Sequence, residues 1–294
     1  MYAFLLAVVF HPSKEIAKQL VFQPHIHLPK EFSAGQTLVF KKDVDLKFIS
    51  INQKKMSLIG KNHLLGVVPL YGGNTVKILG QWEIQKLSWL EKQFSHPSVD
   101  YFVEYRNVKK HPLKQASNLR IPASVWKKVN DDHADLKEQQ KQKMKKLLSQ
   151  VPSQDFQLDC YKAPINSVVV SKFASPRTLP NGYSYYHSGL DQRARVPSSI
   201  KSIGPGKVVF AEHMIVPGNT LVIDHGGGVY SRFMHLSDFR VEPGSKIQTG
   251  QVVATTGATG RVEAPHLHWE VVWKGNHANP SQFLQALEPI CDQG

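Results

Sequence analysis

The sequence lacks long apolar runs: nowhere in its 294 residues is there an uninterrupted hydrophobic stretch of the roughly 18 residues that a membrane-spanning helix requires. It contains only two cysteines, Cys160 and Cys291, which excludes a disulfide-dense miniprotein. With 41% hydrophobic and 20% charged residues, it is too ordinary in composition for a disordered or collagen-like chain. Length and composition therefore predict a folded protein of about two domains.

The N-terminal segment, residues 1–32, opens with ten apolar residues that end at His11-Pro12. The run is too short to span a membrane. It also lacks the basic region before it and the small-residue cleavage site after it that a secretory signal normally has. Two interpretations stay open: the remnant of a signal that starts upstream, and a buried strand.

Acidic residues are scarce in the first half of the chain. Residues 1–150 carry 24 Lys+Arg against 12 Asp+Glu, whereas residues 151–294 carry 12 against 11. The basic half predicts peripheral attraction to an anionic wall or membrane surface, with a solvated lysine-rich surface as the alternative. The interleaved aromatic and glycine motifs of common RNA-binding modules are missing, so we expect no nucleic-acid partner.

Three regions follow the N-terminal segment. Residues 33–121 contain short alternating apolar runs between turn signals, which predicts a small β-sandwich. Residues 122–152 are rich in helix formers and lack glycine and proline between Pro122 and Pro152, which predicts a helical linker. We expect its lysine cluster to be a solvated face, with contact to a polyanion as the alternative. Residues 153–294 again predict strands, with Gly226-Gly227-Gly228 as a hairpin turn. The fold class is therefore mainly β.

Two histidine motifs in the last region predict a metal site. In His266-Leu267-His268, positions i and i+2 of a strand present both imidazoles to one face. In His187-Ser188-Gly189-Leu190-Asp191, the glycine is expected to let the backbone fold tightly, so that imidazole and carboxylate converge. Histidine nitrogen and aspartate oxygen are ordinary zinc ligands, and a third histidine, most naturally His268, leaves the fourth position open as in catalytic sites.

A hydrolase also needs groups that accept a proton and stabilise the developing oxyanion. His266 lies beside His268 on the expected strand face. His235 ends a strand in which alternation places Val229, Ser231, Phe233 and His235 together. Two neutral structural histidines satisfied in a sheet are the alternative for the pair His266 and His268.

The ordered motifs His187-x-x-x-Asp191, Met234-His235-Leu236 and Pro265-His266-Leu267-His268-Trp269-Glu270 resemble the LytM/lysostaphin-type zinc endopeptidases that cut peptidoglycan peptides. The resemblance covers roughly residues 165–287. It implies an antiparallel β-sheet catalytic domain with one Zn²⁺ per chain, held by His187, Asp191 and His268. It also implies that His235 and His266 are catalytic.

The sequence departs from the family pattern at two places. Ala174 stands where a glycine is usual, and Asp191 is followed by the polar Gln192-Arg193 instead of small apolar residues. We expect both departures to touch the rim of the substrate groove and to leave the metal site intact.

The resemblance implies an exported monomer in the periplasm or cell envelope of a Gram-negative bacterium, hydrolysing peptidoglycan crosslinks. D-alanyl-diaminopimelate bonds are the default and glycine bridges the alternative. A non-catalytic wall-binding or amidase-regulating module of the same fold is the competing function. The first half also resembles the β-sandwich and helical linker of some Gram-negative members, where it could inhibit, target or scaffold.

Cys160 and Cys291 lie just inside the two ends of the last region. Domain termini often lie close together, and an exported protein meets oxidising conditions. We therefore predict a Cys160–Cys291 disulfide, with two free buried thiols as the alternative.

Overall fold

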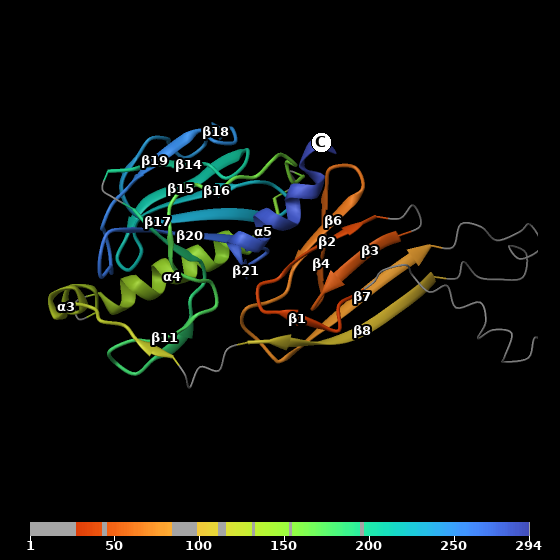
Figure 1. The fold of residues 1–294 in the computed structure, drawn as a ribbon, viewed down its shortest axis with the longest axis horizontal. Helices are drawn as coiled ribbons and strands as arrows, with labels where there is room; N and C mark the ends of the chain where they lie inside the picture. Colours follow the sequence, from red (N-terminus) through yellow and green to blue (C-terminus); the bar gives the residue numbers. More distant parts are fainter. Residues whose placement is uncertain are drawn as a thin grey trace, which may run out of the picture.

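A computed structural model describes residues 28–42, 46–83, 99–110, 116–130, 133–152, 155–194 and 197–293 (Figure 1). The prediction for the apolar run at residues 1–10 lies outside the described residues. No helix among the described segments is long and apolar enough to cross a membrane.

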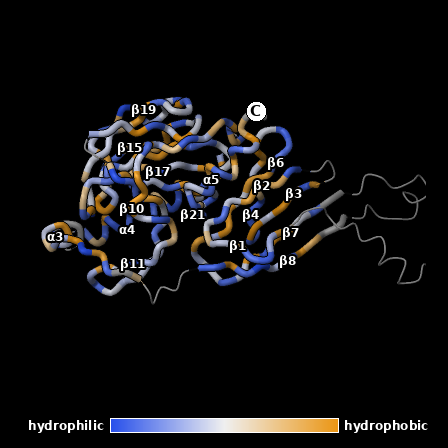
Figure 2. Tube along the Cα trace, in the orientation of Figure 1, coloured by the Kyte–Doolittle hydropathy of each residue, from blue (hydrophilic) through white to orange (hydrophobic). Residues whose placement is uncertain are grey.

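The first part of the chain folds into two sheets, one with strand order β1-β8-β7-β3-β4 and one with order β2-β6-β5. Their strands are β1 (Glu31–Ser33), β2 (Thr37–Lys41), β3 (Leu46–Ile51), β4 (Lys54–Lys55), β5 (Ser57–Ile59), β6 (His63–Val67), β7 (Thr75–Glu83) and β8 (Val99–Lys109). Hydrophobic stretches recur along these strands in Figure 2. The two sheets face each other closely, because a Cβ added at Gly66 of β6 would lie 2.6 Å from Ile51 of β3. This arrangement agrees with the alternating pattern of the sequence.

The linker contains two helices, α3 (Ala123–Asn130) and α4 (Ala134–Leu148), where the sequence predicted one continuous helix. His133, which directly precedes α4, has a φ of −145° and a ψ of 37°, outside the helical region. Before the helices, β9 (Ser117–Asn118) pairs with β11 (Pro176–Thr178), which pairs with β12 (Ser184–Tyr186).

The remaining strands form a ten-stranded sheet with the main order β10-β13-β20-β17-β16-β15-β18. Its members are β10 (Val169–Ser171), β13 (Leu190–Arg193), β14 (Ser199–Lys201), β15 (Gly206–Met214), β16 (Gly218–Asp224), β17 (Val229–Phe239), β18 (Lys246–Ile247), β19 (Val252–Thr256), β20 (His266–Trp273) and β21 (Asn276–Ala278). The predicted hairpin connects β16 to β17, and all three of its glycines have the positive φ that glycine tolerates best. The mainly-β fold class is thus confirmed. Helix α5 (Pro280–Leu287) and the 3₁₀ helix η2 (Glu288–Gln293) end the chain.

Helix α4 packs on one face of this sheet, as Figure 1 shows. Met144 and Leu148 are buried there against Phe210, Met214, Val222, Tyr230 and Val272. The helix is therefore seated on the sheet by its apolar side, while its lysines lie on the remaining surface.

Direct contacts join the two-sheet region to the ten-stranded sheet. The Ser57 hydroxyl accepts a hydrogen bond from the Trp273 indole at 2.8 Å and donates to the Gly227 carbonyl at 2.5 Å. The Asn279 amide donates to the Gly35 carbonyl at 2.8 Å. Because Ser57 and Trp273 are buried, these bonds fix the two regions against each other.

The structure contains a Cys160–Cys291 disulfide with a Cα–Cα distance of 4.6 Å and a sequence separation of 131 residues. In the loop-closure model a bridge of this span contributes about 4 to 5 kcal/mol to stability by restricting the unfolded chain. It ties η2 to the segment that precedes the sheet.

His225 is expected to make stability depend on pH. Its Nδ1 donates to the Pro205 carbonyl at 2.6 Å, its Nε2 accepts from the Ser231 hydroxyl at 2.8 Å, and burial lowers the pKa of His225 to about 4. The unfolded chain takes up this proton near the ordinary pKa of 6.5, so the contribution is present above pH 6.5 and is lost as pH falls towards 4. We expect a loss of roughly 3 kcal/mol from this group over that window. Urea unfolding of wild type and His225→Gln measures it, and identical pH slopes would contradict it.

Candidate metal centre

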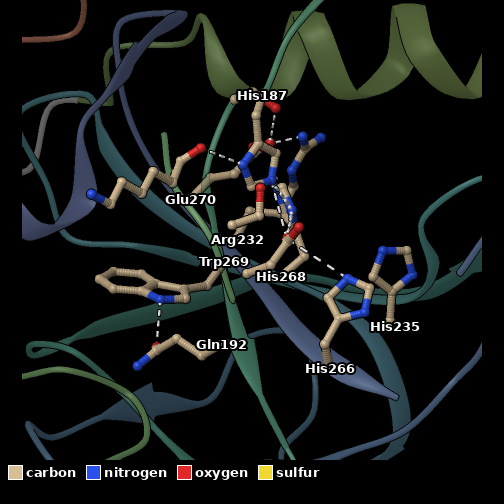
Figure 3. Close-up of polar contacts among 12 residues, drawn as sticks. His187, Gln192, Arg232, His235, His266, His268, Trp269 and Glu270 are labelled. Carbon is tan, nitrogen blue, oxygen red and sulfur yellow. Dashed lines mark hydrogen bonds and ion pairs between the residues drawn. The ribbon is translucent and has the colours of Figure 1, made fainter. Parts of the chain in front are cut away.

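Three buried side chains meet where β13 and β20 pair. The antiparallel register sets Asp191 directly opposite His268, and His187 lies just before β13. Asp191 Oδ1 is 3.0 Å from His187 Nε2 and 2.7 Å from His268 Nδ1, and the two nitrogens are 3.0 Å apart (Figure 3). The three predicted ligands thus offer one oxygen and two nitrogens to a common point.

The outer nitrogens of both imidazoles are already engaged. His187 Nδ1 lies 2.8 Å from the Lys172 carbonyl, and His268 Nε2 lies 3.1 Å from Glu270 Oε1. Because these oxygens can only accept, both outer nitrogens carry protons, so in its neutral form each ring turns a lone pair inward. Two lone pairs and a carboxylate facing one another fit a divalent cation, and N,N,O is a donor set that zinc accepts.

The charge state of Asp191 suits this role. Burial alone would raise the pKa of Asp191, but its close contacts with the imidazoles of His187 and His268 outweigh burial and hold that pKa well below its usual range. Arg177 adds an ion pair, with Nη2 2.6 Å from Asp191 Oδ2. Oδ2 is therefore occupied by the guanidinium, and Oδ1 is the oxygen directed at the histidines.

The sequence predicted that Gly189 lets the backbone fold tightly enough for His187 and Asp191 to converge. The role of this glycine does not rest on a positive φ, which it does not have. Instead, a Cβ at Gly189 would lie 2.3 Å from the Trp269 carbonyl and 2.8 Å from His268 Nε2. The glycine allows the backbone before β13 to approach β20 closely, which brings His187 within reach of His268.

Ala174 holds the backbone that positions His187. Its amide donates to the His187 carbonyl at 2.8 Å, and the His187 amide donates to the Ser175 carbonyl at 2.9 Å. Ala174 has a φ of 59°, in the left-handed region that favours glycine. The expected family glycine therefore corresponds to a real conformational demand, which alanine meets at a cost.

Ala174→Gly is expected to raise the free energy of unfolding by about 0.5 to 1 kcal/mol, because glycine adopts the left-handed region without strain. Ala211→Gly in the interior of β15 is the matched control and should lower it by a similar amount, since φ there is ordinary. Urea unfolding of both variants checks the pair. Equal destabilisation by both would show that Ala174 is not strained.

The predicted alternation along β17 is wrong at His235. Val229, Phe233 and Leu236 belong to the main core, but Met234 and His235, although adjacent, both line the cleft. The register between β16 and β17 shifts at this point, and His235 has a φ of 62°. The strand thus contains a β-bulge, which turns His235 out of the core and towards the metal ligands.

His266 and His235 lie side by side at the edge of the site (Figure 3). Their ring centroids are 5.1 Å apart, and His266 Nε2 is 3.7 Å from Asp191 Oδ1. His266 Nδ1 donates to the Ala264 carbonyl at 2.7 Å, and His235 Nδ1 to the Thr259 carbonyl at 2.9 Å. Burial, with the nearby His266 and His268, lowers the pKa of His235 to about 3, so its inward Nε2 is unprotonated at neutral pH.

Glu270 lies behind His268. It belongs to the predicted sequence motif, but the motif assigned it no role. Its side chain is fully buried. Oε1 contacts His268 and accepts from the Ser188 hydroxyl at 2.5 Å, while Oε2 is 2.6 Å from Arg232 Nη2. Burial would raise the pKa of Glu270, but the charge of Arg232 holds it well below its usual range. The sequence signal for this contact was the position of Glu270 two residues after His268, which places both side chains on the same face of the strand.

The expectation that Gln192 touches the groove rim is wrong. Strand alternation turns Gln192 away from the face of Asp191, and its Oε1 accepts from the Trp269 indole at 2.8 Å on the buried side (Figure 3). Its amide donates to the carbonyls of Ile165 and Ser167. Gln192 is thus a packing residue, whereas Arg193 does line the cleft.

Comparisons with known proteins converge on one family. Residues 185–280 match the model of peptidase family M23. The chain is 37% identical over 93 residues to the peptidoglycan DD-endopeptidase ShyA of Vibrio cholerae, covering 32% of this chain and 22% of ShyA. It is 36% identical over 123 residues to ShyB of the same organism, covering 42% of this chain and 28% of ShyB. The matched segment therefore spans about a quarter of these relatives.

The fold has a counterpart over most of its length. A solved Pseudomonas aeruginosa structure described as a peptidase M23 superposes with a TM-score of 0.61 at 20% identity, covering 86% of this chain and 95% of that one. At this identity the likeness concerns the fold alone. Together with the family match, the site shows that residues 185–280 of this chain form a peptidase family M23 domain, as the histidine and aspartate motifs predicted.

Proposed function

We propose that this protein is a zinc-dependent endopeptidase that hydrolyses peptide bonds in bacterial peptidoglycan, with D-alanyl-diaminopimelate crosslinks as its substrate. The observation that carries the proposal is the convergence of two inward histidine lone pairs and an ionised aspartate in an open cleft. The Vibrio cholerae relatives, which are peptidoglycan DD-endopeptidases, support the substrate class.

In this proposal His187, Asp191 and His268 hold the ion. Zinc, when bound, supplies a Lewis acid that polarises the substrate carbonyl and acidifies water. The inward Nε2 of His266 accepts the proton of the attacking water and returns it to the leaving amine. His235 Nε2, left unprotonated by the bond from Nδ1 to the Thr259 carbonyl, shares in proton transfer, and once it has taken up a proton it donates to the developing oxyanion.

The proposal also covers the domain organisation, the location and the partners of the protein. We divide the chain into an N-terminal segment (1–32), a β-sandwich domain (33–121), a helical linker (122–152) and the peptidase domain (153–294). We place the protein as a monomer in the periplasm or cell envelope of a Gram-negative bacterium, in peripheral contact with anionic surfaces and without a nucleic-acid partner. The Cys160–Cys291 bridge is in keeping with an oxidising compartment.

Digestion of purified wall sacculi tests the function. We expect zinc-loaded protein to release monomeric muropeptides cut between D-alanine and diaminopimelate, identified by mass spectrometry, and a chelator to stop the release until zinc is restored. Cleavage at glycine bridges alone would correct the bond. Bound zinc with no cleavage of any sacculus would favour a wall-binding or amidase-regulating module.

A further inference from the structure

The metal centre opens into a cleft of about 1530 Å³. The peptidase domain supplies one wall, including Lys172, Arg177 and the segment from Arg261 to His266. The other wall is the linker helix α4, whose residues from Ala134 to Ser149 line the same space. The linker is therefore a wall of the cleft and not only a connector.

This cleft is strongly cationic. Nine lysine and arginine side chains line it, against four carboxylates. Two of the carboxylates are already neutralised by ion pairs, Asp191 by Arg177 and Glu270 by Arg232. Glu138 accepts a hydrogen bond from Gln142 and pairs with Lys141, and its ion pair is of the exposed kind that contributes little. The excess of positive charge thus faces the space that substrate must enter, and a bound divalent ion would increase it.

The α4 wall presents its charge as a row. Lys137, Lys141 and Lys145 follow one another at intervals of four residues and all line the cleft, so they lie on one helix face. Met144 and Leu148 next to them are buried on the sheet. The row is therefore attached to a fixed part of the helix.

A chain of hydrogen bonds connects this helix to the opposite wall. Gln140 Oε1 accepts from the Ile215 amide at 2.9 Å, and the next carbonyl, that of Val216, accepts from the Arg261 amide at 2.8 Å. Arg261 is half-buried, with its guanidinium beside Tyr185. These hydrogen bonds fix the position of α4 relative to Arg261 at the entrance to the metal centre.

Resting on the proposed function, we propose that Arg261 and the lysine row of α4 determine specificity by binding free carboxylates of the wall peptide, so that the enzyme selects acidic stem peptides over amidated ones. An ionised acceptor bound to a fixed cation forms a stronger hydrogen bond than a neutral amide does. Converting carboxylate to carboxamide preserves shape and removes that charge. Peptides joined by neutral glycine bridges gain nothing from these cations.

The test compares a synthetic cross-linked stem-peptide dimer carrying free carboxylates with its amidated analogue. We expect wild type at low salt to have a kcat/KM about tenfold higher for the free acid, mostly through KM, and the preference to shrink as salt rises. Arg261→Gln and the double variant Lys141→Gln with Lys145→Gln should each reduce the preference to about twofold or threefold. In both variants kcat/KM should fall more for the free-acid dimer than for the amidated dimer.

Arg240→Gln is the matched control, because Arg240 is exposed, pairs with Asp238 and does not line the cleft. It should keep the wild-type preference. Equal kcat/KM for both dimers in wild type at low salt would overturn the inference while leaving the endopeptidase function intact.

Calorimetric binding of the two dimers to zinc-loaded His266→Ala separates the two proposals. If wild type cleaves neither dimer but this variant binds the free acid about tenfold more tightly, the endopeptidase function fails and the carboxylate-binding wall stands. Equal binding, or loss of the preference in Arg240→Gln as well as in Arg261→Gln, would overturn the assignment of the wall.

Discussion

His268→Ala is expected to lose the metal and the activity together, whereas His266→Ala should keep the metal and lose turnover. His268 Nδ1 is one of the three atoms directed at the common point, so its removal leaves two ligands. His266 is anchored by Ala264 and contacts the edge of the site without completing it. For His266→Ala we expect kcat to fall by about 10²- to 10⁴-fold, the range for loss of a general acid–base group.

Metal content of the purified variants, measured alongside muropeptide release, checks this pair. His213→Ala is a matched control, because His213 is exposed, bonds to Asn219 and does not line the cleft. It should retain both metal and activity. Full activity in His266→Ala, or a full complement of zinc in His268→Ala, would contradict the assignment of these two residues.

Glu270→Gln is expected to weaken zinc binding by about 10- to 100-fold without removing any ligand. Glu270 Oε1 accepts the outer proton of His268, which fixes the ring orientation and makes Nδ1 a better donor. A glutamine at this position keeps the shape but lacks the charge. A competition titration with a chromophoric chelator measures the affinity directly, and Ser188→Ala, which removes only a hydrogen bond to Glu270, should change it much less.

Glu270→Ala should additionally destabilise the fold, by up to about 3 kcal/mol, because it leaves the guanidinium of Arg232, which is only 15% exposed, without its partner. Urea unfolding of metal-free protein separates this loss from the effect on zinc. Unchanged zinc affinity in Glu270→Gln would show that Glu270 serves only to neutralise Arg232.

The sequence predicted the parts of the fold that depend on local pattern. Alternation placed His266 and His268 on one face of β20, and the structure has Leu267 buried on the other. The same rule failed at His235, because a bulge changes the alternation by one residue. The bulge depends on the pairing of β17 with its neighbour β16, which residue spacing within β17 does not reveal. Local spacing also could not reveal the break between α3 and α4.

The candidate site shows the same division. The ligand set could be predicted because histidine and aspartate types carry the chemistry themselves. Arg177 and Arg232 were missed because their importance lies in tertiary ion pairs with Asp191 and Glu270. Gln192 was misplaced because polarity in the sequence was taken to mean the groove, whereas its amide is used inside the sheet.

The packing of α4 on the ten-stranded sheet has a practical consequence for the isolation of the catalytic half. A fragment beginning after the linker would leave Val222, Tyr230 and Val272, now at most 1% exposed, open to water. An exposed apolar surface of this kind promotes self-association. Fragments for crystallisation or assay should therefore start before residue 134, so that they include the helix that covers this face of the sheet.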